Sequence, residues 1–215
     1  MNSPAKLPQQ SRSFETRKRI LSESARLFSV RGYHDTKVDQ IIKAAKVTSG
    51  AFFHHFKGKE DLAFAVIDYH MEERRRTLDR IEKSVGASDP LERVFRRLDA
   101  VGQMVVRRRN RKGGCLIGNL SLALSDTHPA FRKRLGECFD EMALEFQSHL
   151  DEAAGNSGLS GNQDTKEMAR YIVSVIEGAI MLTRTHCDVH LIERQLQHLK
   201  DDIMRSFQSP DLVNR

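Results

Sequence analysis

The sequence has no tryptophan, only five prolines and only three cysteines. The cysteines, at positions 115, 138 and 187, are odd in number and lack Cys-x-x-Cys spacing, which argues against a disulfide framework and predicts a reducing cytoplasm. The most apolar segment, residues 172–182, is interrupted by Ser174, Glu177 and Gly178, so no membrane span and no membrane partner are expected. The beginning, MNSPAKLPQQSRS, lacks the apolar stretch of a secretory signal.

Charge is distributed unevenly along the chain. The 215 residues are 39% hydrophobic and 30% charged, which is typical of a globular protein, and carry a net charge of +6. Residues 1–60 contain 12 Lys and Arg against 5 Asp and Glu, a net charge of +7, whereas the remaining residues have a net charge of −1. A basic N-terminal module predicts a polyanionic partner for that part and a different role for the rest.

The spacing of apolar residues predicts an all-α protein of about nine helices. Prolines occur only at positions 4, 8, 90, 129 and 210, long helix-period segments lie between them, and alternating β-branched runs are absent. We expect a flexible polar tail over residues 1–12 and a loop over 155–163. The helices are expected at about 13–31, 38–45, 49–55, 59–81, 88–109, 115–125, 129–154, 164–186 and 189–208.

The first three helices have the order and lengths of a helix-turn-helix unit. Two short helices are joined by the tight turn Val47-Thr48-Ser49, an arrangement in which the last short helix can enter the major groove of DNA. Phosphate contacts require cations around that turn. The lysines that surround it are Lys37, Lys43, Lys46, Lys57 and Lys59.

Residues 16–62, TRKRILSESARLFSVRGYHDTKVDQIIKAAKVTSGAFFHHFKGKEDL, resemble the DNA-binding module of the TetR (TetR/AcrR) family of bacterial transcriptional regulators. The match covers the LF-x-x-x-G-(Y/F), T-x-V-x-x-I-x-x-x-A and V-(S/T)-x-G motifs and the following F-x-x-K-x-x-L. The resemblance implies a three-helix DNA-binding domain over 13–58 and a helical effector-binding and dimerisation domain over 59–215. It also implies a bacterial homodimeric repressor without enzymatic activity, cofactor or metal, released from a palindromic operator by a small-molecule or electrophile/oxidant inducer.

The resemblance also assigns roles to individual residues. Thr36 and Lys59 correspond to phosphate contacts, and Lys59 stands at a helix N-terminus, where the helix dipole favours anions. Phe53 replaces the usual tyrosine and so lacks the hydroxyl that binds a phosphate. His54 is expected to contact either a base edge or a phosphate. The expected DNA-binding residues are Thr36, Lys37, Lys46, Thr48, Ser49, Gly50, Ala51, Phe53, His54 and Lys59, and the expected core residues of this domain are Phe28, Ile41, Phe52 and Phe56.

Apolar stripes mark the last two helices and the middle of the chain. In the family the last two helices pair with their copies, and a palindromic operator requires two reading heads. The expected dimer residues are Ile172, Val175, Ile176, Ala179, Ile192, Leu196, Leu199 and Ile203, and ordinary core packing is the alternative. Residues that line an effector cavity or fill the core are Phe95, Leu98, Met104, Val105, Leu116, Leu120, Leu124, Phe139, Met142 and Phe146.

Cys115 is a candidate effector or redox site. It follows Gly113-Gly114 at an expected helix start and comes after the basic run 107–112, and both features stabilise a thiolate. The segment GGCLIGNLSLALSD resembles a TetR subgroup with a Gly-Cys-Leu segment, which includes a repressor responsive to N-ethylmaleimide. Arg184 stands where that repressor has an assisting lysine. Two roles therefore stay open for Cys115, a sensor and an inert buried thiol.

Two other functions are alternatives to transcriptional regulation. A detoxifying enzyme would use Cys115 or the histidines, but the sequence shows no set of nucleophile, base and orienting group. An architectural DNA-binding protein would need no effector. His186, Cys187 and His190 lack a fourth ligand and predict a polar turn rather than a metal site.

Overall fold

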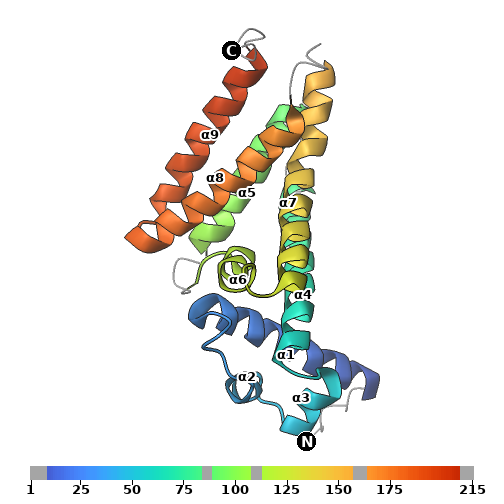
Figure 1. Ribbon diagram of the computed structural model, residues 1–215. Helices are drawn as coiled ribbons and strands as arrows, with labels where there is room; N and C mark the ends of the chain where they lie inside the picture. Colours follow the sequence, from blue (N-terminus) through green and yellow to red (C-terminus); the bar gives the residue numbers. More distant parts are fainter. Residues whose placement is uncertain (1–8, 84–88, 108–112, 157–163, 209–215) are drawn as a thin grey trace, which may run out of the picture.

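The computed structural model describes residues 9–83, 89–107, 113–156 and 164–208, which are helical apart from short connections (Figure 1). The predicted all-α class is confirmed. The helices of the described residues are α1 (Gln9–Arg31), α2 (Val38–Ala45), α3 (Ser49–His55), α4 (Lys59–Lys83), α5 (Pro90–Arg107), α6 (Leu116–Leu124), α7 (Pro129–Asn156), α8 (Thr165–His186) and α9 (His190–Gln208).

The N-terminal end of the first helix differs from the expectation. α1 begins at Gln9, so residues 9–12 belong to a helix and not to a tail, and residues 1–8 lie outside the described residues. The polar composition of this segment was misleading because glutamine, serine and arginine are also tolerated on the exposed side of a helix. α1 ends as expected at Gly32, whose φ of 84° is in the left-handed region that glycine adopts without strain.

Helices α1, α2 and α3 form a head around a small apolar core. Phe28, Ile41 and Phe52 are fully buried and Phe56 is nearly so, which confirms the four expected core residues. α2 ends at Lys46, in the left-handed conformation, and the chain then enters α3 through Thr48, whose hydroxyl accepts a hydrogen bond from the Ala51 N–H at 3.1 Å. The two short helices of the head are thus held by local turn and cap geometry.

The 25-residue helix α4 extends from the head into the body formed by α5, α7, α8 and α9 (Figure 1). α6 lies between α1 of the head and the long body helices. An aromatic group joins the two parts: the Phe131 ring on α7 stacks on Phe64 of α4 at a centroid distance of 4.2 Å, and the Tyr33 ring lies 6.0 Å away. A movement in the body can therefore reach the head through both α4 and α6.

The structure corrects the expected dimer residues on α8 and α9. Seven of them are buried inside the single chain, and Val175 is half-buried and packs against the same core. They fill the space between α8, α9, α5 and α7, so the seven buried side chains are not available to a second copy. The alternative that the sequence left open, ordinary core packing, is the one that the structure shows. The buried residues are Ile172, Ile176, Ala179, Ile192, Leu196, Leu199 and Ile203.

Candidate functional site

The outer surface of the head presents most of the expected DNA-binding residues to solvent. Ala51 is half-buried, and Phe53 is exposed although its ring contacts Phe52 edge-on at 5.2 Å. The exposed residues are Lys37, Lys46, Thr48, Ser49, Gly50, Phe53 and His54. They follow the start of α2, the turn and α3, so a continuous surface of small, basic and ring-bearing side chains is accessible on one helix-turn-helix unit.

Thr36 does not belong to this surface. Its side chain is fully buried, its hydroxyl donates to the Gly32 carbonyl at 2.7 Å, and its backbone N–H donates to the Tyr33 carbonyl at 3.2 Å. Both donors are therefore used inside the protein, and the expected phosphate contact is corrected. Thr36 closes the turn between α1 and α2, which positions the head.

Lys59 lies at the start of α4, as expected, but its ammonium group has partners in the protein. Nζ donates to the His34 carbonyl at 3.2 Å and lies 4.2 Å from the centre of the Tyr33 ring. Partial burial lowers the pKa of Lys59, and the charge of Asp35 opposes that change. An ammonium group has three donors, so Lys59 retains capacity for a phosphate at this helix N-terminus.

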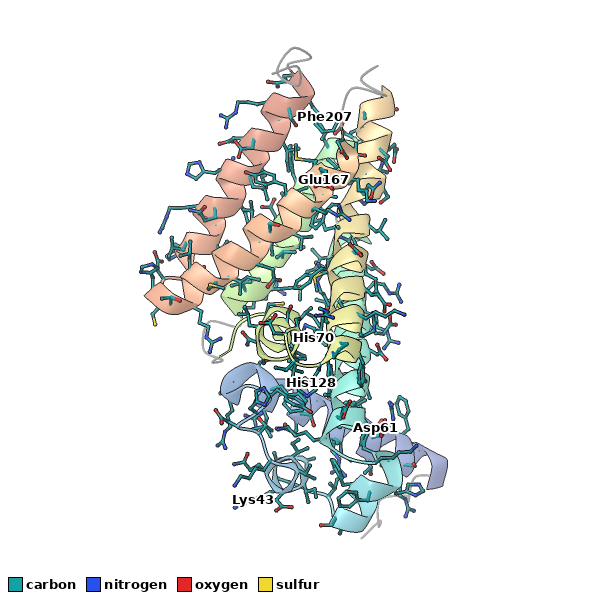
Figure 2. The ribbon with its side chains drawn as sticks, viewed as in Figure 1. Lys43, Asp61, His70, His128, Glu167 and Phe207 are labelled. Atoms are coloured by element: carbon teal, nitrogen blue, oxygen red, sulfur yellow. The ribbon has the colours of Figure 1, made fainter. Side chains whose placement is uncertain are left out.

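A cavity of about 630 Å³ lies in the body, above α6 and next to the end of α1. Its wall is mainly aliphatic, with polar groups from α4, α8 and the residues before α6. Of the ten candidate residues, Met104, Val105 and Met142 line it. The other seven are buried or half-buried core residues. The lining residues that the sequence did not single out for this role include His70, Arg74, Val173, Ile176, Glu177, Ile180 and Thr183. His70 is labelled beside α6 in Figure 2.

Cys115 lines this cavity beside the carboxylate of Glu177. Burial, and after it the charge of Glu177, raise the pKa of the Cys115 thiol to about 12. The backbone N–H groups of Gly118 and Ile117 act in the opposite direction, as a helix N-terminus should, but their effect is smaller. The expectation of a stabilised thiolate is therefore corrected. Of the basic run 107–112 that was expected to stabilise the thiolate, residues 108–112 lie outside the described residues.

Glu177 reaches Cys115 across the first turn of α6. A Cβ added to Gly118 would lie 2.6 Å from Oε2 of Glu177, so the absence of a side chain there leaves room for the carboxylate. Burial raises the pKa of Glu177, while a hydrogen bond with Cys115 and the charge of Arg74 lower it. A signal for Glu177 was present in the sequence, because it is the one charged residue within the apolar segment 172–182.

The start of α6 connects the cavity to the head. Nδ2 of Asn119 donates to the Ser29 carbonyl of α1 at 3.1 Å, and Oδ1 of the same side chain accepts from Arg184 of α8 at 3.4 Å. Gly113 has a φ of 118°, and a Cβ there would lie 2.9 Å from the Ser29 carbonyl oxygen. The residues that wall the cavity, Gly113 to Cys115, thus pack directly against the last turns of α1.

The thiol chemistry of Cys115 can be measured directly. In a variant with Cys138 and Cys187 replaced by serine, we expect iodoacetamide to alkylate Cys115 at least about tenfold more slowly at neutral pH than it alkylates free N-acetylcysteine, because little thiolate is present. Glu177→Gln removes a charge that raises the pKa, so alkylation should become several-fold faster. Glu167→Gln, at the far end of α8 (Figure 2), should leave the rate unchanged. A rate equal to that of N-acetylcysteine in the parent protein would contradict the raised pKa.

Other site types find little support in the described ranges. There, no three His, Cys, Asp or Glu side chains are grouped so that they could hold a metal ion. Nor does any helix in the same ranges combine the length and apolar character needed to cross a membrane. Cys187 ends α8 in the left-handed conformation, and His190 begins α9 with its Nδ1 2.9 Å from Glu193, so this segment forms the polar turn that was predicted.

Comparison with known proteins gives consistent matches. The family description "Bacterial regulatory proteins, tetR family" matches residues 20–66, and "Tetracyclin repressor-like, C-terminal domain" matches residues 90–199. The transcriptional regulator AcuR of Cereibacter sphaeroides is 31% identical over 153 residues, which cover 70% of this chain and 68% of AcuR. The crystal structure of a TetR transcriptional regulator from Chloroflexus aurantiacus J-10-FL superposes with a TM-score of 0.77, at 27% identity, over 91% of this chain and 97% of that one.

The repressor NemR of Escherichia coli is a more distant relative. It is 22% identical over 192 residues, which cover 88% of this chain and 94% of NemR. The crystal structure of its reduced form superposes with a TM-score of 0.64 at 20% identity, covering 86% of this chain and 96% of that chain. At this distance the similarity shows a shared fold. It does not establish the subgroup with a Gly-Cys-Leu segment.

Proposed function

This chain belongs to the TetR family of bacterial regulatory proteins and is a DNA-binding transcriptional regulator, and from that premise we propose a homodimeric repressor that a small molecule releases from a palindromic operator. The proposal includes no catalytic step and no cofactor, in keeping with relatives that are named as regulators. NemR, named as a repressor, supports repression over activation.

The DNA-contacting part of the proposal rests on the exposed residues of α3 and its flanking turn. We assign base edges to Thr48, Ser49 and His54, with Gly50 allowing the backbone to approach the groove closely. Lys37, Lys46 and Lys59 are assigned to phosphates, which supply most of the affinity and set the register of the head on the duplex. Phe53 contacts the sugar-phosphate backbone through its ring alone.

The dimer part rests on the outer face of α8 and α9. Tyr171, Met181 and Leu182 on α8, together with Met204 on α9, are large apolar side chains that remain exposed, with Met181 at 56% and Leu182 at 43%. This face is opposite to the buried apolar stripe of α8 and α9 that the sequence predicted as the dimer interface. A second copy of the chain is its proposed occupant, because operator recognition needs two heads at a fixed separation.

The contact between α6 and α1 is the observation that carries the release mechanism. Cys115 and the two glycines before it wall the cavity, and Asn119, one turn later, binds the Ser29 carbonyl of the head. A ligand that prefers a different position of α6 would also favour a different position of α1, and so would lower DNA affinity by population shift. We propose a ligand bound without covalent chemistry, because the raised pKa of Cys115 disfavours reaction at its sulfur.

Selection of bound duplexes from a random DNA pool tests the proposed function. The expected product is a palindrome whose two half-sites have centres about one helical turn, ~34 Å, apart. Enrichment of a single asymmetric half-site would contradict the dimer. Binding without any enriched sequence would favour an architectural DNA-binding protein and overturn the repressor.

A further inference from the structure

Glu177 is the one carboxylate that lines the cavity among the described residues. It is half-buried, and its hydrogen-bonding partner is the neutral thiol of Cys115. Within the part of the chain that the structure describes, no ion pair joins it to a cationic side chain, whereas Glu145 and Asp68 on α7 and α4 have arginine partners. A carboxylate facing an apolar cavity without a counter-charge is costly unless something else supplies one.

Arg74, which lines the same cavity, already has an ion-pair partner. Its Nη1 donates to Glu145 at 2.6 Å, and Arg97 approaches the same carboxylate at 3.1 Å. Glu145 thus keeps the guanidinium of Arg74 within a group of buried charges, where it is too far from Glu177 to form an ion pair. Arg74 attracts the Glu177 carboxylate through space without forming an ion pair with it.

Thr183 provides a second polar group in the same wall. Its side chain is only 7% exposed, and its hydroxyl has no hydrogen-bond partner among the described residues. It belongs to the same helix as Glu177 and lines the same cavity. An unpartnered buried hydroxyl is uncommon, because burying such a group without a hydrogen bond costs free energy. Thr183 is six residues after Glu177 on α8, about 9 Å along the helix axis, so Glu177 is the group of this wall that a single charged group of a ligand can satisfy.

We propose that the cavity binds an apolar molecule carrying a protonated amine, with the ammonium group on Glu177. The apolar body of the ligand would lie against Val101, Met104 and Ile180. This assignment rests on the proposed function for the role of the cavity and adds the chemical class of the ligand.

The chemistry of the wall distinguishes this class from its neutral and anionic counterparts. Burial raises the pKa of Glu177, so its charge is disfavoured in the empty cavity, and an ammonium ion would offset that penalty. A neutral alcohol would fill the same volume without the charge pairing. A ligand carboxylate would be repelled by Glu177. The two arginines of the lining already have partners, Arg74 with Glu145 at 2.6 Å and Arg184 with Oδ1 of Asn119 at 3.4 Å.

Three probes of closely similar shape test the assignment: 1-naphthylmethylamine, 1-naphthylmethanol and 1-naphthoate. Isothermal titration calorimetry of the full chain at neutral pH should give an affinity for the amine at least about tenfold higher than for the alcohol, and the weakest binding for the carboxylate. In Glu177→Gln the amine should bind no better than the alcohol. Glu167→Gln, the same charge loss on the same helix away from the cavity, should behave as the parent.

Alcohol binding reports whether a variant is folded. If Glu177→Gln binds the alcohol as the parent does, loss of the amine preference reports the carboxylate itself. The proposal is overturned if the parent prefers the alcohol or the carboxylate, if it binds none of the three, or if Glu177→Gln keeps the preference for the amine.

A parallel measurement with operator duplex separates this inference from the proposed function. Release of DNA by the alcohol but not by the amine would overturn the ligand class and leave the repressor standing. Preferential binding of the amine without any change in DNA affinity would support the ligand class and contradict ligand-induced release.

Discussion

Replacing Met181 and Leu182 by glutamate is expected to convert the dimer to a monomer and to lower operator affinity by about 10²–10⁴-fold. Both side chains are exposed on the outer face of α8, so the single chain should fold normally with glutamate there. In the dimer the new carboxylates would be buried against their copies without a partner. Sedimentation equilibrium would measure the mass, and fluorescence anisotropy with the selected duplex would measure the affinity.

Leu144→Glu is the matched control for this experiment. Leu144 is 59% exposed on α7 and not on α8 or α9, so the substitution adds one carboxylate, where the double variant adds two, outside the proposed interface. It should leave the mass and the operator affinity unchanged. A double variant that keeps the mass of two chains would show that the outer face of α8 is not the interface, and the dimer would then need another surface.

Phe131→Ala is expected to lower the free energy of unfolding by about 3–5 kcal/mol. Phe131 is fully buried, and its ring meets Phe64 in a nearly parallel stack with an interplanar angle of 6°. Removing the ring leaves a cavity where α7, α4 and the connection after α1 meet, and also removes the contact with Tyr33. Urea denaturation followed by far-ultraviolet circular dichroism would measure the loss.

Phe139→Ala, on the same helix, is the control for the position of Phe131. Phe139 is only half-buried, so removal of its ring should cost clearly less than the same change at Phe131. Equal losses at the two positions would contradict a special role of Phe131 at the junction between head and body.

Much of the fold could be predicted from the sequence because helix periodicity and end signals are local properties. The positions of Gly32 and Thr48 defined where α1 ends and α3 begins, and both act as expected. Phe28 and Phe52 were recognisable as core residues from their places in the head. The expected DNA-binding residues of α3 came from the resemblance to the TetR family, and the structure places Ser49, Gly50, Phe53 and His54 among the exposed residues of that helix.

The partner of an apolar stripe could not be predicted in this way. The apolar stripe of Ile192, Leu196 and Leu199 predicts that one side of the last helix is covered. The stripe does not say whether the same chain or a second copy covers it. Packing of α9 against α8 and α5 decided for the same chain, and Met181 and Leu182 of α8 remain exposed. Thr36 is similar, because its burial depends on the way α1 turns back onto α2.

The sequence by itself determined an all-α protein with a basic DNA-binding head, because charge distribution, helix period and motif spacing are written along the chain. Only the tertiary structure decided the chemistry of the cavity. Cys115 follows basic residues in the sequence, yet the group that faces it is Glu177, from a helix about sixty residues further on. The pKa of a thiol depends on its burial and on charges close to it in space, and both are set by the packing of α6 against α8.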